Sequence, residues 1–164
     1  MTGQTNTAAS SLLDAMSFIW REAELLDRRE YPAWLTLWRT EGIYVIPIDP
    51  DTEDFDNSLN YVLDNDEMRR ARVARLMSAH SMSATAAART ARTVSRFVVV
   101  ADTAHAMTVR CVQHLVETKR DVQRTYAAEI TYDLARGVEG LLIERKVVRL
   151  INSTDALGGV AYLF

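Results

Sequence analysis

The chain has 164 residues, of which 48% are hydrophobic and 25% are charged, with six glycines and three prolines. This length and composition are typical of a soluble globular domain and exclude a disordered or fibrous chain. The formal net charge of -3 gives no electrostatic reason to bind nucleic acid or an anionic membrane surface, so we expect soluble protein partners.

Two further features indicate the cellular context. Cys111 is the single cysteine, so no intrachain disulfide can form and a reducing compartment is expected. Residues 1–16 have neither a basic segment nor a long apolar segment of the kind found in signal peptides, and no later run approaches the length of a membrane span. We therefore expect a cytoplasmic protein without a membrane segment.

The N-terminal part of the chain predicts a tail followed by a helix. Residues 1–9 are small and polar and predict a flexible tail, and we expect residues 10–164 to form a single domain. Apolar residues then recur at helical spacing as far as Leu26, with Ser10 or Ser11 available as the N-cap. This pattern predicts an amphipathic helix with one buried face.

A short second helix is predicted next. Pro32 suits the first turn of a helix, and Gly42 is expected to end it. Trp34 and Trp38 lie in this short apolar segment, and we expect both to belong to the core rather than to a ligand site.

The middle of the chain predicts strands and a third helix. Residues 41–48 are rich in β-branched side chains and predict a strand, in which Pro47 marks an edge or a bulge. The acidic residues 49–56 predict a solvated loop, because they lack the glycine and the glutamate that a calcium loop of the EF-hand type needs. A short strand at 59–63 and a helix at 67–77 follow.

The helix at 67–77 is rich in arginine, yet its arginines are not gathered on one face. At about 100° per residue they spread over most of the circumference, and Arg69 falls on the apolar stripe of Val73 and Leu76. A helix that binds nucleic acid would segregate its basic face. We therefore expect Arg69 and Arg72 to form ion pairs within this chain or with a partner subunit.

After a loop rich in Ser, Ala and Thr, the remainder predicts four strands, at 94–101, 107–117, 125–134 and 141–151. The third strand alternates cleanly, with one face made of Tyr126, Ala128, Ile130, Tyr132 and Leu134. Helices followed by long strands with short turns argue for the α+β class, as a curved, mostly antiparallel sheet with the helices covering one face.

The histidines and the cysteine do not form a recognisable metal-binding pattern in the sequence. Of the three histidines, His105 and His114 would lie on opposite faces of one regular strand, although a turn at His105 would remove that argument. One cysteine excludes a zinc ribbon, and it excludes an intrachain Rieske cluster, which needs two Cys and two His. Cys111 lies in the middle of a strand, where we expect a buried inert thiol. We expect no cofactor in this chain.

One constellation of polar residues remains near the helix ends. In a curved sheet the concave side can form a pocket, which Asp27, Tyr31 and His80 could line as base, donor and proton shuttle of a stand-alone dehydratase or isomerase. Alternatively, Asp27 and Tyr31 satisfy backbone and arginine groups where the first two helices join. We favour the structural alternative, because no second motif supports the catalytic one.

Four stretches carry a resemblance to a known family. They are "EAELLDRREYPAWLTLWRTEGIYVIP" (22–47), "DEMRRARVARLMS" (66–78), "ARTARTVSRFVV" (88–99) and "YAAEITYDLAR…GLLIERKVVRLINSTDAL" (126–157). In this order they resemble the small (beta) subunit of the aromatic-ring-hydroxylating, Rieske-type non-haem iron dioxygenases. The resemblance implies the cone-shaped fold that this subunit shares with nuclear transport factor 2 and scytalone dehydratase.

The resemblance also implies a function and partners. The alpha subunit of this family carries the Rieske 2Fe-2S cluster and the mononuclear iron, so this chain is expected to be a non-catalytic structural subunit in the cis-dihydroxylation of an aromatic substrate. Beta subunits of the family form homotrimers that join three alpha subunits as α3β3, with electrons delivered by a reductase, sometimes through a ferredoxin. The expected subunit surface includes five arginines: Arg69, Arg72, Arg89, Arg92 and Arg96.

Overall fold

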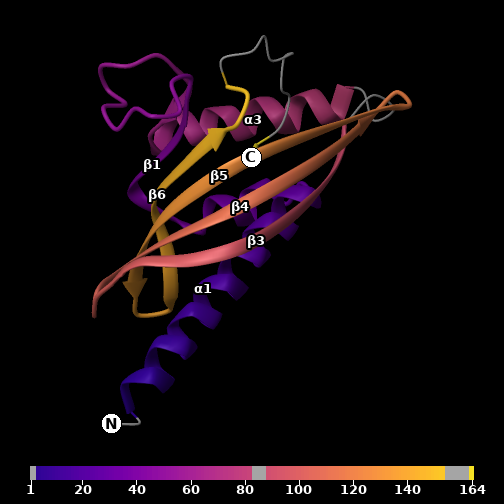
Figure 1. The fold of residues 1–164 in the computed structure, drawn as a ribbon. Helices are drawn as coiled ribbons and strands as arrows, with labels where there is room; N and C mark the ends of the chain where they lie inside the picture. The colour runs from indigo at the N-terminus through magenta and orange to yellow at the C-terminus, as the bar shows by residue number, and fades with distance from the viewer. Residues whose placement is uncertain (1–2, 83–87, 154–162) are drawn as a thin grey trace.

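Six strands form one twisted sheet that curves around a long helix (Figure 1). The computed structural model describes the backbone of residues 3–82, 88–153 and 163–164, and the side chains of residues 11–78, 88–153 and 163–164. The elements in chain order are α1 (Gly3–Asp27), α2 (Tyr31–Leu35), β1 (Trp38–Pro47), β2 (Asn60–Asp64), α3 (Asp66–Met82), β3 (Arg89–Asp102), β4 (Ala106–Lys119), β5 (Val122–Gly137) and β6 (Gly140–Leu150).

The sheet confirms the predicted α+β class. Its strand order is β2-β1-β6-β5-β4-β3, and neighbouring strands are antiparallel except for β1 and β6, which are parallel. Helix α1 runs along the inner face of the sheet, and α3 lies across the top of the molecule in the view of Figure 1. The indole of Trp20 on α1 donates to the main-chain oxygen of Val94 at 3.1 Å, which fixes the helix against β3.

The inner face of the sheet is the core, as the alternation in β5 predicted. All five inward residues of that strand are buried, namely Tyr126, Ala128, Ile130, Tyr132 and Leu134. Trp34, Trp38 and Tyr44 pack edge to face with ring centroids 5.3–6.1 Å apart. The assignment of Trp34 and Trp38 to the core is therefore confirmed.

Helix α1 begins earlier than the sequence predicted. It starts at Gly3, so the N-cap expected at Ser10 or Ser11 is wrong. No glycine or proline interrupts residues 4–27, and two alanines, the best helix formers, precede Ser10, so nothing ends the helix there. The flexibility of residues 1–9 and the single domain of residues 10–164 stay predictions.

Helix α2 is shorter than predicted, because Gly42 lies inside β1 instead of ending the helix. A side chain at Gly42 would place its Cβ 2.9 Å from the main-chain oxygen of Ile143 and 3.0 Å from that of Arg39. This glycine therefore allows β1 and β6 to approach closely at an irregularity in their pairing. The bulge expected at Pro47 is confirmed by a register shift between β1 and β2.

Candidate functional site

The joint between α1 and α2 is closed by main-chain hydrogen bonds. The N–H of Arg29 donates to the oxygen of Leu26 at 3.1 Å, and the N–H of Glu30 donates to that of Leu25 at 2.8 Å. Arg29 takes the left-handed conformation (φ 60°) that ends many helices in this way. Its guanidinium donates to the main-chain oxygen of Ala88 at 2.5 Å, which ties the joint to the start of β3.

Asp27 is the acceptor at the centre of this joint. It accepts from the hydroxyl of Thr90 at 2.9 Å, from the N–H of Arg92 at 2.8 Å, and from the guanidinium of Arg92. Arg92 in turn donates to the main-chain oxygen of Leu163. The carboxylate thus holds the end of α1 against β3 through both main-chain and side-chain donors.

Tyr31 lies at the same joint, whereas the side chain of His80 lies outside the described residues. Tyr31 is buried, and this burial raises the pKa of its phenol, an effect that the positive charges of Arg29 and Arg92 partly oppose. The contacts of Asp27 with main-chain and arginine groups are those that the structural alternative anticipated, and the structural role of Tyr31 stays a prediction. The catalytic role of Asp27, Tyr31 and His80 stays a hypothesis.

The interior of the sheet contains a polar cluster that the sequence did not predict. Glu22 on α1 and Lys146 on β6 are 1% and 0% exposed, and their carboxylate and ammonium groups lie 2.8 Å apart. The same carboxylate accepts from the indole of Trp34 at 2.9 Å and from the phenol of Tyr132 at 2.6 Å. We call Glu22, Trp34, Tyr132 and Lys146 the interior cluster.

A weak signal for the interior cluster does exist in the sequence. Glu22 follows Ile19 by three positions and precedes Leu26 by four, so it falls on the buried stripe of α1. Lys146 lies two and four positions before Val148 and Leu150 on the same strand, so it shares a face with these two residues, which both point inward. A charge at each of two buried positions indicates that they pair, although nothing in the sequence says that the two positions meet.

Burial shifts the titration of the groups around this cluster. It lowers the pKa of Lys146, while the nearby carboxylate of Glu22 acts in the opposite direction. Burial raises the pKa of Tyr44 and of Tyr132, and it raises the pKa of the Cys111 thiol to about 12. The predicted burial of Cys111 is confirmed, and its lack of reactivity stays a prediction that the raised pKa supports.

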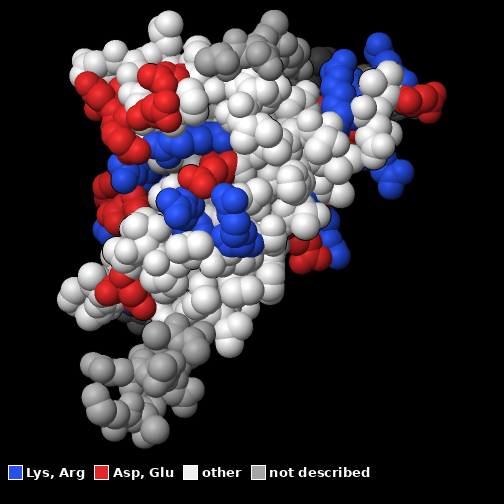
Figure 2. Space-filling model, viewed as in Figure 1, with Lys and Arg blue, Asp and Glu red and all other residues white. Residues whose placement is uncertain are grey.

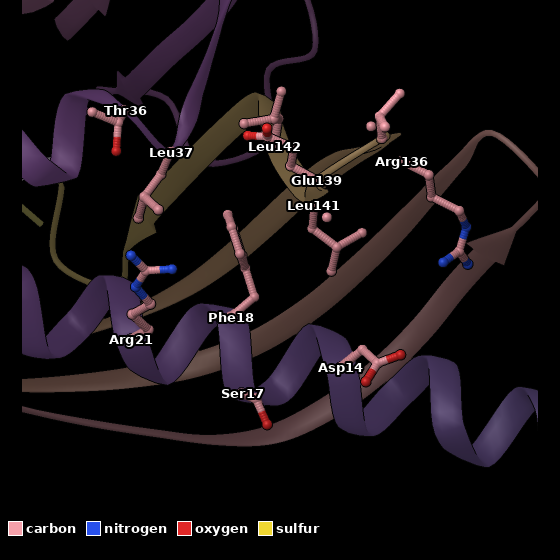
Figure 3. A pocket seen from close by; sticks show the side chains of 13 residues that line it. Asp14, Ser17, Phe18, Arg21, Thr36, Leu37, Arg136, Glu139, Leu141 and Leu142 are labelled. Atoms are coloured by element: carbon pink, nitrogen blue, oxygen red, sulfur yellow. The ribbon is translucent and has the colours of Figure 1, made fainter.

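A groove of about 890 Å³ opens between α1 and the turn that joins β5 to β6. Figure 3 shows Phe18 pointing from α1 towards Leu141 and Leu142 across this groove. Charged side chains, among them those of Asp14 and Arg21, stand on the α1 wall. The groove has an apolar floor and a charged rim, and neither Asp27 nor Tyr31 lines it.

Three of the five arginines predicted for a subunit surface are buried or half-buried and held by contacts within the chain. Arg69 is fully buried, lies 4.3 Å from the ring centroid of Trp38 and donates to the main-chain oxygen of Gly42. Arg72 holds both carboxylate oxygens of Asp64, at 2.6 and 3.0 Å. The third is Arg92, which holds Asp27. A role of these three residues in subunit contact stays a prediction.

Arg89 and Arg96 are exposed, and their role in subunit contact stays a prediction. Arg96 pairs with Glu129 of β5 at 3.1 Å on the outer face of the sheet, where Arg145 likewise pairs with Asp133 at 2.8 Å. Figure 2 shows both signs of charge gathered beside a broad uncharged area on this side of the molecule. The outer face therefore offers charged and neutral surface together.

The histidines do not meet at a metal site in the part of the chain that the structure describes. His105 lies in the turn before β4, and His114 lies exposed on that strand. No group of three or more His, Cys, Asp or Glu side chains is placed to hold a metal ion among the described residues. Within the same residues, no helix has the length and apolar character needed to cross a membrane.

Comparison with known proteins gives a family and a fold. The family model described as "Ring hydroxylating beta subunit" matches residues 21–155. The small subunit of 2-halobenzoate 1,2-dioxygenase from Burkholderia cepacia is 30% identical over 148 residues, which are 87% of this chain and 90% of the relative.

Two solved structures illustrate the likeness of fold. The beta subunit of benzoate 1,2-dioxygenase from Burkholderia mallei superimposes with a TM-score of 0.78, at 24% identity over 92% of this chain and 96% of that one. An NTF2-like protein with a cystatin-like fold from Novosphingobium aromaticivorans superimposes with a TM-score of 0.63, at 18% identity over 93% of this chain and 92% of that one. The predicted cone-shaped, NTF2-like fold is confirmed.

Proposed function

This chain belongs to the family of ring hydroxylating beta subunits, as its sequence indicated, and from this premise we propose how it serves its enzyme. It is a structural beta subunit of a dioxygenase, and hence part of an oxidoreductase complex. The observation that carries this assignment is the family match over residues 21–155, which contain all six strands of the sheet.

The partner that we propose is an alpha subunit that carries the iron centres. A Rieske cluster needs two Cys and two His, whereas Cys111 is the only cysteine of this chain and is buried. The residues present therefore do not fit that cluster, and no redox step is assigned to them. We further propose a homotrimer of this chain within an α3β3 assembly in the cytoplasm, supplied with electrons through a reductase with or without a ferredoxin.

The substrate that we propose is an aromatic acid of the benzoate type, which the assembled enzyme converts by cis-dihydroxylation. The support is the 30% identity with the small subunit of a 2-halobenzoate 1,2-dioxygenase over most of both chains. The alpha subunit would hold the substrate beside its iron, and this chain would contribute by assembly.

Asp27 and Tyr31 are proposed to be structural, with no part in the reaction. The support is that Asp27 accepts three hydrogen bonds from β3. If so, Tyr31→Phe should leave the turnover number of the assembled dioxygenase within about twofold, whereas loss of a general acid or base costs about a hundredfold or more. A hundredfold loss in a folded, assembled Tyr31→Phe enzyme would contradict the structural role, whereas the stand-alone dehydratase or isomerase alternative requires an activity of the isolated chain that Tyr31→Phe lowers.

Reconstitution tests the proposed function directly. The alpha subunit, this chain, and both together would be supplied with reductase, NADH, oxygen, and benzoate or 2-chlorobenzoate, with oxygen uptake and diol formation as readouts. Product should form at full rate only when both chains are present. Equal turnover by the alpha subunit alone, or conversion of an aromatic acid by this chain alone, would contradict the proposal.

A further inference from the structure

Phe164 lies inside the curved sheet and is held there by its ring and by its main chain. Leu163 and Phe164 are 2% and 3% exposed. The ring of Phe164 meets that of Tyr126 edge to face, with the centroids 5.7 Å apart. Its main-chain oxygen accepts from the ammonium group of Lys146 at 2.7 Å, and its N–H donates to the phenol oxygen of Tyr44 at 3.1 Å.

The groups that hold Phe164 are themselves positioned by the rest of the fold. Lys146 is fixed by Glu22 at 2.8 Å, and its ammonium lies 5.9 Å from the ring centroid of Tyr44. Tyr44 packs edge to face against Trp34 and Trp38. An aromatic wall and a cationic donor are thus in place on β1, β5 and β6, independently of Phe164.

The chemistry of the bound residue indicates what else fits. In a phenylalanine residue, the Cβ and Cα atoms separate the aromatic ring from the carbonyl carbon, which is the skeleton of a 3-arylpropanoic acid. We infer that the inside of this sheet is a binding site for small molecules with an aromatic ring two carbons from a carboxyl or carbonyl oxygen. In this structure the chain fills that site with its own Phe164.

Physical reasons support binding when Phe164 is removed. A cavity left by a buried aromatic side chain collapses only in part, and dry apolar cavities inside proteins can accept small aromatic molecules. The alanine that replaces Phe164 keeps the main-chain oxygen that Lys146 contacts, so a ligand carboxylate would compete with that oxygen for the ammonium group, with which it forms a charge-assisted hydrogen bond. The ring supplies affinity, and the oxygen supplies selectivity.

The test uses the full chain with Phe164→Ala and measures binding by calorimetry or ligand-observed NMR. The probe is 3-phenylpropanoate. Its controls are 3-phenylpropan-1-amine, which replaces the acceptor by a cation, and benzoate, whose oxygen lies too close to the ring. We expect the probe to bind Phe164→Ala at least tenfold more tightly than it binds the parent chain, and at least tenfold more tightly than either control binds the variant.

A second substitution separates the oxygen contact from simple cavity filling. Glu22→Gln with Lys146→Met, introduced into the Phe164→Ala chain, removes both charges of the pair and the donor together. This should weaken the binding of 3-phenylpropanoate at least tenfold. Equal binding of the acid and the amine, or no loss in the triple variant, would mean an apolar hole without a built site and would overturn the inference.

Refolding keeps the test decisive if Phe164→Ala does not fold alone. In that case, refolding with millimolar 3-phenylpropanoate should restore a cooperative thermal transition, because a ligand that binds only the folded state stabilises it. The amine at the same concentration should not restore it. Failure of the acid to rescue folding would overturn the inference, and neither result depends on dioxygenase activity.

Discussion

Glu22 and Lys146 show how two charges are accommodated inside this sheet. The carboxylate accepts from Lys146, Trp34 and Tyr132, so each partner offsets part of the desolvation cost of the other. Removing one member of such a pair leaves the other charge buried without compensation. The pair therefore makes stability sensitive to single substitutions.

Glu22→Ala should lower the free energy of unfolding by about 3–5 kcal/mol, because Lys146 then stays buried without its carboxylate. Glu24→Ala is the matched control on the same helix, since Glu24 pairs with Arg28 in the solvent. Its effect should stay within about 0.5 kcal/mol. Urea denaturation of the two variants measures both values, and equal midpoints would show that the buried pair contributes nothing.

Stability should fall as the pH rises above about 9, because burial raises the pKa of Cys111 to about 12. In this window the unfolded thiol has lost its proton while the folded thiol keeps it, so unfolding releases a proton and higher pH favours the unfolded state. Burial raises the pKa of Tyr31, Tyr44 and Tyr132 as well, and their contributions have the same sign.

Cys111→Ala isolates the contribution of the thiol to this alkaline loss. Between about pH 9.5 and 10.5 the variant should lose about 1.4 kcal/mol less than the parent, which is the value of one proton per pH unit. Lys146 acts in the opposite direction, because its pKa is lowered, but it does so in both proteins and cancels in the comparison. Parallel pH profiles of the two proteins would refute the assignment.

At the scale of the elements, Arg69 connects α3 to β1 through its side-chain contacts. Its guanidinium lies over Trp38 and donates to the main-chain oxygens of Gly42 and Arg39, so a helix residue satisfies acceptors at the irregular part of the strand. The sequence anticipated that a charge on an apolar stripe needs a partner. It did not show that this partner is the main chain of β1.

Arg69→Ala should destabilise the chain by about 3 kcal/mol, since buried carbonyl groups lose a charged donor. Arg70→Ala is the neighbouring control, because Arg70 is exposed and pairs only with Asp66 among the contacts described. Arg70→Ala should lower the free energy of unfolding by about 0.5 kcal/mol or less. Thermal or urea unfolding distinguishes the two variants. An Arg69→Ala protein as stable as the parent would show that these contacts of Arg69 do not stabilise the fold.

Gly42→Ala should likewise cost about 1–3 kcal/mol, because two main-chain oxygens leave no room for a Cβ. Gly137→Ala provides a comparison, since the nearest atom to its Cβ would be 3.2 Å away, at the main-chain oxygen of Gly140. We expect a clearly smaller loss there. A larger loss at Gly137 than at Gly42 would contradict the steric account of β1.

The types of element followed from local patterns, whereas the contacts of the interior did not. Periods of two and of 3.6 residues are local, so β5 and α1 could be predicted as elements with a buried face. The start of α1 at Gly3 was missed because a weak cap signal at Ser10 does not oblige a helix to begin. Glu22 and Lys146 lie 124 positions apart, and only the complete fold brings them together.

The whole molecule presents a folded beta-subunit scaffold with exposed residues that could meet other chains. Arg89 and Arg96 are exposed, whereas Arg69 and Arg92 are engaged inside the chain. A charge reversal at Arg69 or Arg92 therefore acts first on folding. Arg89 and Arg96 are the arginines whose substitution can report on subunit contact without disturbing the interior.

Sedimentation velocity of this chain, alone and co-expressed with its alpha subunit, tests the central claim most directly. The account predicts that the 18.5 kDa chain sediments with the alpha subunit as one complex containing equal numbers of both chains. Arg89→Glu with Arg96→Glu should shift that complex towards free subunits while the melting temperature of the isolated chain stays unchanged. A stable monomer that forms no complex with the alpha subunit would contradict the claim.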